Sequence, residues 1–220
     1  MCGRFTLTSD PAQLSVEFGG LVLPDDYRPR YNIAPTQNVL AVVAGPEGLR
    51  AGWLRWGLIP HWAKDPAIGN RLINARAETI AEKPAFRSAF QRRRCLIVAD
   101  GFYEWARTPA GKRPMWIHLQ SRRPFAFAGL WERWVSPEGE EVKSCTIVTT
   151  DANPFLRTIH DRMPVILPEP ERGRWLDPSQ DATSLLELLA PYPSDDLAAY
   201  EVSTLVNSPS NDMPELIEPV

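Results

Sequence analysis

The feature that most constrains the fold is a succession of short apolar segments, each about as long as a β-strand and bounded by turn residues. Valine, isoleucine, phenylalanine and tryptophan, which favour pleated and half-buried backbone, recur in these segments. They cover residues 39–44, 49–56, 95–99, 115–119, 125–134, 144–150 and 165–167. The turn at residues 45–48, Gly-Pro-Glu-Gly, joins the first two into a hairpin. A sheet is therefore the predicted frame of the molecule.

The remaining periodic segments predict only short helices. Residues 9–18 offer Ser9 or Asp10 as an N-cap, with Pro11 in the first turn. Residues 77–94 have helical spacing that is interrupted near Pro84. Their last three residues are arginines, which the dipole of a helix C-terminus favours, so we interpret this run as structural in preference to DNA-contacting. Further helices are expected over residues 170–175 and 182–189.

Composition limits the classes of protein that this chain can belong to. The 220 residues, 44% hydrophobic and 23% charged, are typical of one globular domain, which we expect to cover 1–220. No apolar run approaches the length of a membrane span and no basic, then apolar leader opens the chain, so we expect a cytoplasmic protein that uses no membrane. The net charge of −3 excludes a protein that is basic overall, but it permits a local basic groove.

Arginine supplies 20 of the 24 basic residues, because lysine occurs only at positions 64, 83, 112 and 143. The planar guanidinium suits phosphate groups and stacks on bases, which favours a nucleic-acid partner. A genome rich in arginine codons would give the same excess, and the composition alone leaves both explanations open.

The cysteines and histidines do not form a metal site in sequence. Cys2, Cys95 and Cys145 are odd in number and widely spaced, which fits neither a disulfide framework nor a paired zinc motif. Cys95 and Cys145 lie in apolar runs and are expected to be buried. The three histidines lack ligand spacing, and no phosphate loop, nucleophile elbow or dinucleotide fingerprint is present, so we expect no metal and no cofactor.

Cys2 has a reaction that no internal residue shares once Met1 is removed. A free α-amine with a pKa of about 7.7–8.0 then stands beside a thiol with a pKa of about 8.5. The amine condenses with an aldehyde, and the thiol closes on the imine to give a thiazolidine. Any residue can fall second in a chain, so the Met-Cys start requires support from other residues.

Four internal residues have polar side chains in unusual surroundings. His160 stands at the junction of a helix and a strand, where it either points into a cleft or makes a structural hydrogen bond. Glu104, among aromatic residues, lies either on a solvent-facing edge or in an apolar pocket that raises its pKa. Asn74 and Arg76, two apart in an extended link, face the same way and suit a phosphate or carbonyl oxygen, although a loop cap would use the same groups.

Six ordered motifs resemble one known family. They are MCGRF from Met1, YNIAPT from Tyr31, WGLIP from Trp56, INARAET from Ile73, GFYEW from Gly101 and IHDRMP from Ile159. Together they resemble the SOS-response-associated peptidase (SRAP) family, whose members process abasic sites. The resemblance implies an α+β, β-rich single domain, and we expect a mainly antiparallel, partly barrel-like sheet core with short peripheral helices.

The resemblance also implies a partner and a set of site residues. The partner is single-stranded DNA with abasic sites, crosslinked through a thiazolidine by a protein that has lyase-type and self-processing activity. We separately expect the protein to be a monomer. The catalytic residues would be Cys2, Asn74, Glu104 and His160, and the DNA contacts would be Arg4, Pro35, Trp62, Arg76 and Arg162. Relatives can carry a second tryptophan after the position of Trp62, but Ala63 stands here.

An abasic sugar is mostly a closed hemiacetal, so an acid and a base must open its ring before an aldehyde exists. His160 and Glu104 are the available pair, and we assign ring opening to His160. Two alternatives stay open from the sequence: a cysteine peptidase or amidohydrolase that uses Cys2 on amides, and a nucleic-acid reader that is not catalytic.

Overall fold

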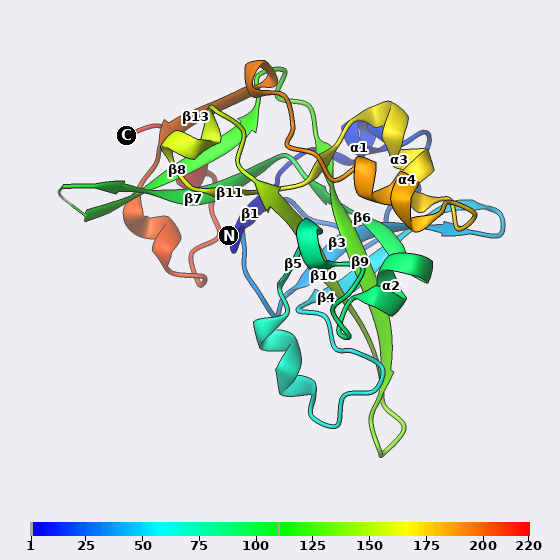
Figure 1. Ribbon diagram of the computed structural model, residues 1–220. Coiled ribbons are helices and arrows are strands. Elements are labelled where there is room, and N and C mark those ends of the chain that lie inside the picture. Colours follow the sequence, from blue (N-terminus) through cyan, green and yellow to red (C-terminus); the bar gives the residue numbers. More distant parts are fainter. Residues whose placement is uncertain (1, 110) are drawn as a thin grey trace.

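The computed structural model describes residues 2–109 and 111–220, and a closed barrel of five strands forms its centre (Figure 1). Around the barrel, the strands are β10 (Glu141–Asp151), β4 (Gly48–Trp56), β3 (Asn38–Gly45), β6 (Arg94–Ala99) and β9 (Phe125–Val135), which pairs again with β10. Every pairing in this ring is antiparallel except β4 with β10, where Ser144 lies opposite Arg55 in parallel register. The ring leaves these five strands without a free edge.

The surroundings of strand β6 explain why its sequence is apolar throughout and does not alternate between apolar and polar residues. All six of its residues are buried, since one face points into the barrel and the other is covered by α2 (Arg87–Arg92) and α3 (Glu169–Leu176). Trp175 of α3 donates its indole N–H to the carbonyl of Cys95 at 3.0 Å and packs against Phe90 of α2. A strand that is covered on both faces has no position for a polar side chain without a partner.

A second antiparallel sheet lies against the barrel. Its order is β13 (Leu197–Glu201), β8 (Gly111–Leu119), β7 (Gly101–Thr108), β1 (Phe5–Leu7) and β2 (Arg30–Ile33). Phe5 of β1, opposite Phe102 of β7, packs edge-on against Trp56 and Phe127 of the barrel with ring centroids 5.2 and 5.7 Å apart. These aromatic contacts join the two sheets and hold the N-terminal strand between them.

The remaining elements are short. Strands β5 (Asn74–Arg76) and β11 (Arg162–Pro164) pair with β10, and β12 (Ile166–Leu167) pairs with β9. The other helices are α1 (Pro11–Glu17) and α4 (Ala182–Glu187), with 3-10 turns η1 (Pro66–Arg71), η2 (Ala77–Thr79), η3 (Leu156–Thr158), η4 (Ser194–Asp196), η5 (Thr204–Asn207) and η6 (Pro214–Ile217). Among the described residues, we find no helix that is both long and apolar enough to span a bilayer.

The predicted α+β class, the antiparallel barrel-like core and the peripheral helices are confirmed. Cys95 and Cys145 are buried as expected. The helix predicted over residues 77–94 is wrong in extent, because only η2 and α2 are helical and Pro84 lies in the turn between them. Arg94 opens strand β6 instead of ending a helix. Its buried guanidinium donates to the carbonyls of Phe90, Gln91, Trp175 and Asp177, which ties the ends of α2 and α3 together.

Candidate functional site

Three strands bring predicted site residues onto one face of the sheet. In the pairings of β10 with β5 and β11, Asn74 is opposite Ile147, Arg76 is opposite Thr149 and Arg162 is opposite Asp151. Directly paired residues share a face, and so do residues two apart in a strand. Asn74, Arg76 and Arg162 therefore project from the same side, although 86 positions separate the last two.

Cys2 is buried at this site. It precedes β1, its thiol lies 3.9 Å from the carbonyl oxygen of Arg4, and its own carbonyl accepts a 2.8 Å hydrogen bond from the Asn74 amide nitrogen. Burial raises the pKa of the Cys2 thiol, and the nearby Glu104 carboxylate raises it further. The thiol is thus held in its protonated form at neutral pH. Met1, whose removal the predicted aminothiol chemistry would require, lies outside the described residues.

Glu104 is buried and does not lie on a solvent-facing edge of the sheet, which excludes one of the two alternatives for this residue. Both faces of β7 are covered at this point, and Glu104 is only 4% exposed, between the buried Tyr103 and the partly buried Trp105. Burial raises the pKa of the Glu104 carboxyl, while the charge of the His160 imidazole acts in the opposite direction. Cys2 and His160 are therefore both within electrostatic range of this carboxyl group.

His160 lies between η3 and β11 with its side chain 30% exposed. The backbone N–H of Arg162 donates to its Nδ1 at 3.0 Å, and the Asp161 carboxylate is also 3.0 Å from that nitrogen. One Nδ1 cannot accept from the amide and donate to the carboxylate at once. The amide is fixed by strand β11 whereas Asp161 is 87% exposed, so we take Nδ1 as the acceptor. In the neutral ring, the proton then resides on Nε2.

The three predicted phosphate-binding arginines have different surroundings. Arg76 is exposed on β5. Arg162, with 12% of its side chain exposed, bonds both oxygens of Glu78 and one of Asp151 at 2.7–3.0 Å. Arg4 donates to the Asn32 side chain at 2.8 Å and to the Val206 carbonyl at 2.7 Å, and burial lowers the pKa of its guanidinium. Arg76 is thus the most accessible of the three, and Arg4 is engaged with the protein itself.

The two predicted base-packing residues lie in loops. Pro35 is half-buried and precedes Thr36, whose φ of +73° is uncommon for a residue with a side chain. Trp62 is 51% exposed and lines a surface hollow of about 430 Å³ together with Ile68 and Arg71. About half of the Trp62 surface is therefore accessible to solvent.

Asn32 is a residue whose function the sequence did not reveal. It is fully buried in β2, and its amide nitrogen lies within 2.7–3.2 Å of the carbonyls of Val206, Ser208 and Asn211, while its oxygen accepts from Arg4. The sequence feature that could have indicated this role is an asparagine between Tyr31 and Ile33 in a segment predicted to be extended. Asn32 and Arg4 together fasten the C-terminal segment beside the residues that follow Cys2.

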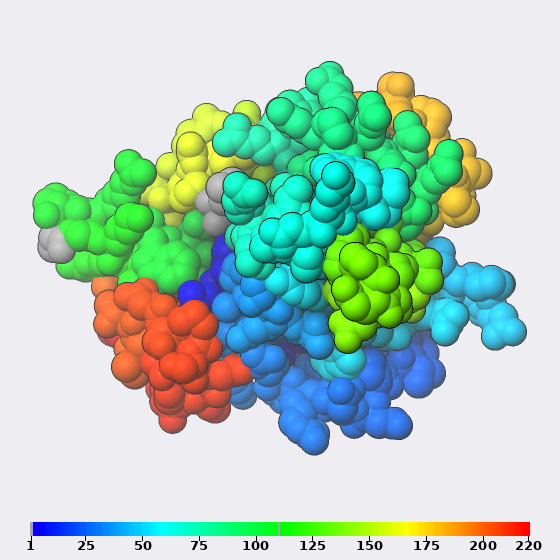
Figure 2. Space-filling model, turned by 90° about the horizontal axis from the view of Figure 1, so that it is seen from below, coloured from blue at the N-terminus to red at the C-terminus, as the bar shows by residue number. Residues whose placement is uncertain are grey.

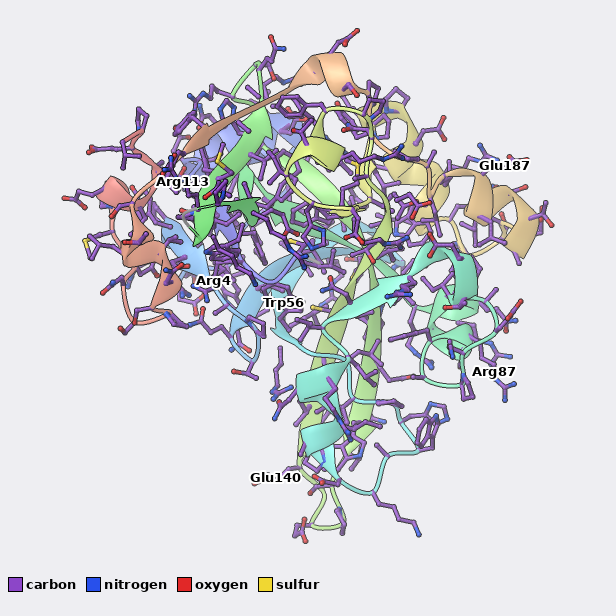
Figure 3. The ribbon with its side chains drawn as sticks, turned by 60° about the vertical axis from the view of Figure 1, so that its left-hand side comes forward. Arg4, Trp56, Arg87, Arg113, Glu140 and Glu187 are labelled. Atoms are coloured by element: carbon purple, nitrogen blue, oxygen red, sulfur yellow. The ribbon has the colours of Figure 1, made fainter. Side chains whose placement is uncertain are left out.

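These segments meet on one face of the molecule. In Figure 2, the blue N-terminal residues reach the surface between the orange-red C-terminal segment and the blue-to-cyan segments. Figure 3 shows the labelled Arg4 between the C-terminal segment and the strands near Trp56. Among the described residues, no group of three or more histidine, cysteine or carboxylate side chains is arranged to hold a metal ion.

The fold and the site define a class of β-rich protein with a buried cysteine at position 2. The backbone carbonyl of this cysteine accepts a hydrogen bond from an asparagine, and a buried glutamate lies nearby. The family model described as SOS response associated peptidase (SRAP) matches residues 1–209. The chain therefore belongs to this family.

Named relatives and solved structures agree with this assignment. The chain is 52% identical over 222 residues to "Abasic site processing protein YoqW" of Bacillus subtilis, covering 99% of each chain. It is 32% identical over 264 residues to "Abasic site processing protein HMCES" of Xenopus tropicalis, covering 98% of this chain and 77% of that one. A crystal structure of a protein from Bacteroides thetaiotaomicron superimposes with a TM-score of 0.85 at 27% identity, with both chains fully covered.

Proposed function

We propose that this protein processes abasic sites in single-stranded DNA by forming a covalent crosslink through Cys2. The observation that carries the proposal is the 2.8 Å hydrogen bond from Asn74 to the Cys2 carbonyl, beside a Glu104 carboxylate that is close enough to raise the pKa of the Cys2 thiol. Relatives at 50–52% identity carry the name abasic site processing protein, which supports the choice of substrate.

The reaction starts after Met1 has been removed. The Cys2 amine attacks the sugar aldehyde and loses water to give an imine, and the thiol then adds to the imine carbon to give a thiazolidine. In its protonated form, with Nδ1 donating to the Asp161 carboxylate 3.0 Å away, His160 would give the Nε2 proton to the ring oxygen as the hemiacetal opens and would become neutral. Burial raises the pKa of Glu104 toward neutral pH. The carboxyl group can then both accept and return a proton as the thiol adds. Asn74 would hold the Cys2 carbonyl and fix the direction of attack.

The same imine explains a lyase activity. If the imine loses its β-phosphate before the thiol adds, the strand breaks instead of becoming crosslinked. Single-stranded DNA suits the site because an unpaired sugar is presented without opening a duplex, and stacking of a base on an aromatic ring contributes about 1–3 kcal/mol. Trp62 and Pro35 would pack against bases beside the lesion. We propose that the protein acts as a monomer in the cytoplasm.

Arg76 is the preferred phosphate ligand of this proposal, because it is exposed on the face that carries Asn74. Arg162 would contribute to phosphate binding if DNA displaced Glu78 or Asp151 from its guanidinium. Arg4 would reach DNA only by giving up its bonds to Asn32 and Val206.

The test uses single-stranded DNA with one abasic site and a denaturing gel. Wild-type protein is expected to give a stable adduct. Cys2→Ala, or a form that retains Met1, is expected to give none, because the aminothiol is absent. Cys145→Ala serves as the control, since its thiol is buried in the barrel, and should keep the adduct. An adduct that persists in Cys2→Ala would place the nucleophile elsewhere, and cleavage of amides without any adduct would favour a peptidase.

A further inference from the structure

We propose that a second hollow, lined by His61, Ser88, Arg92, Arg93 and Arg133, binds a backbone phosphate of the DNA strand beyond the base that packs on Trp62. This inference rests on the proposed function and extends it, because it gives the direction in which the DNA leaves the crosslinking site. The hollow has a volume of about 300 Å³ and joins α2 to strand β9.

The hollow is cationic. Its lining contains three arginines against one carboxylate, that of Glu132. Arg133 is paired with Glu141 outside the hollow, at 2.6 Å, and Arg93 is paired with Glu132 at 2.8 Å. Arg92 is exposed, and no ion pair joins it to any carboxylate in the described part of the chain. It is therefore the cation that is available to a phosphate from solution.

Glu132 holds the Arg93 and His61 side chains in position at the hollow, in addition to contributing one negative charge. It is only 3% exposed; one oxygen accepts from Arg93 and lies 3.2 Å from Nδ1 of His61, and the other accepts the backbone N–H of Arg133 at 2.9 Å. In the protonated ring, Nδ1 donates to the Glu132 carboxylate and Nε2 carries the second N–H. The His61 side chain is 54% exposed, so this nitrogen is accessible for a hydrogen bond to an anion.

The position of His61, next to a residue that lines the other hollow, favours a nucleic-acid phosphate as the anion. The next residue is Trp62, which is 51% exposed, so one short loop presents an aromatic face and a cationic hollow side by side. Alternating bases and phosphates of a single strand match this pairing of a stacking surface with a cation. In Figure 2, the cyan segment that contains the loop lies between the blue-green segment of α2 and the lime-coloured end of β9 and β10, on the face where the N-terminal residues emerge.

The test measures how non-covalent binding depends on salt, with a Cys2→Ala background to prevent crosslinking. Three oligonucleotides carry the abasic site with a long arm on the 5′ side only, on the 3′ side only, or on neither side. Arg92→Ala is expected to lower the slope of log affinity against log salt by about 0.7, the contribution of one phosphate on a single strand, for one of the two armed oligonucleotides alone. His61→Ala should weaken binding of the same oligonucleotide.

Arg87→Ala is the matched control, because Arg87 is exposed on the same helix α2 and does not line the hollow (Figure 3). It should leave all three slopes unchanged. Arg76→Ala should lower the slope for every oligonucleotide, including the one without arms. An Arg92→Ala slope that is unchanged for both armed oligonucleotides, or lowered equally for all three, would overturn the proposal. Failure of the wild-type protein to crosslink any of them would instead overturn the proposed function.

Discussion

At the scale of single residues, burial gives Glu104 its chemistry. Its carboxyl group is buried beside strand β7, where transfer of a negative charge from water is unfavourable. The cost appears as a raised pKa, which is unfavourable for folding at neutral pH and useful for proton transfer. Stability and activity therefore make opposite demands on this position.

The substitution Glu104→Gln should separate the two effects. Below the ordinary carboxyl pKa of 4.5, Glu104 is protonated in both the folded and unfolded states, and wild type and variant should be similarly stable. As the pH rises from there toward the higher folded-state pKa, the unfolded state loses its proton first, so wild type loses stability that the variant keeps. Urea denaturation across this pH range measures the difference.

The same variant should crosslink more slowly, by about 10²–10⁴-fold, because an amide cannot accept the proton. Single-turnover gels measure this rate. A variant that is neither more stable at neutral pH nor slower would remove Glu104 from the proton-transfer role.

At the scale of elements, the C-terminal segment is fastened to the N-terminal strand by a few polar contacts. Arg4 and Asn32 bond the carbonyls of residues 206, 208 and 211, and Tyr103 donates to the carbonyls of Tyr31 and Leu216. Asp212 adds an ion pair with Arg30. This segment has few strand pairings of its own. Side-chain hydrogen bonds therefore hold it in place where a strand would be held by backbone hydrogen bonds.

Arg4→Ala should therefore loosen the segment. The variant loses two hydrogen bonds from a charged donor, and we expect the free energy of unfolding to fall by about 3 kcal/mol. Amide hydrogen exchange over residues 204–211 should become faster. Arg113→Ala removes an exposed ion pair with Glu201 and should cost less than about 1 kcal/mol. Equal losses in the two variants would show that Arg4 does not fasten the segment.

At the scale of the whole molecule, the barrel is packed so closely that side chains of β6 lie directly over the backbone of β9. Gly129 lies opposite Cys95 on one side and Ile147 on the other. A Cβ atom at this position would lie 2.8 Å from the Cys95 sulfur and 2.9 Å from Cδ1 of Ile97. Both distances are shorter than a normal contact, so an added methyl group would displace the Cys95 and Ile97 side chains.

Gly129→Ala is expected to lower the free energy of unfolding by about 1–3 kcal/mol through overpacking. Gly52→Ala, also in a barrel strand, is the control, because no heavy atom lies within 4 Å of the added Cβ. Thermal and urea denaturation should show a loss for the first variant and no loss for the second. A fully stable Gly129→Ala would mean that the barrel relaxes around the methyl group without cost.

The sequence by itself determined most of the strands and short helices, the burial of Cys95 and Cys145, and the presence of a cysteine at position 2. These follow from local patterns: apolar runs of strand length, capping residues, and the identity of the second residue. The ordered motifs also gave the candidate site residues. Each of these features needs only neighbouring residues or their order along the chain.

Only the tertiary structure decided that the barrel closes, that Asn74 bonds Cys2, that Glu104 is buried, and which partners the arginines take. Arg4 bonds a carbonyl 202 positions away and Arg162 pairs with a glutamate 84 positions away, while Arg76 stays exposed. The local sequence around each arginine does not contain this difference. Burial and pairing depend on which distant segments pack against a residue, and they are fixed only when the whole chain has folded.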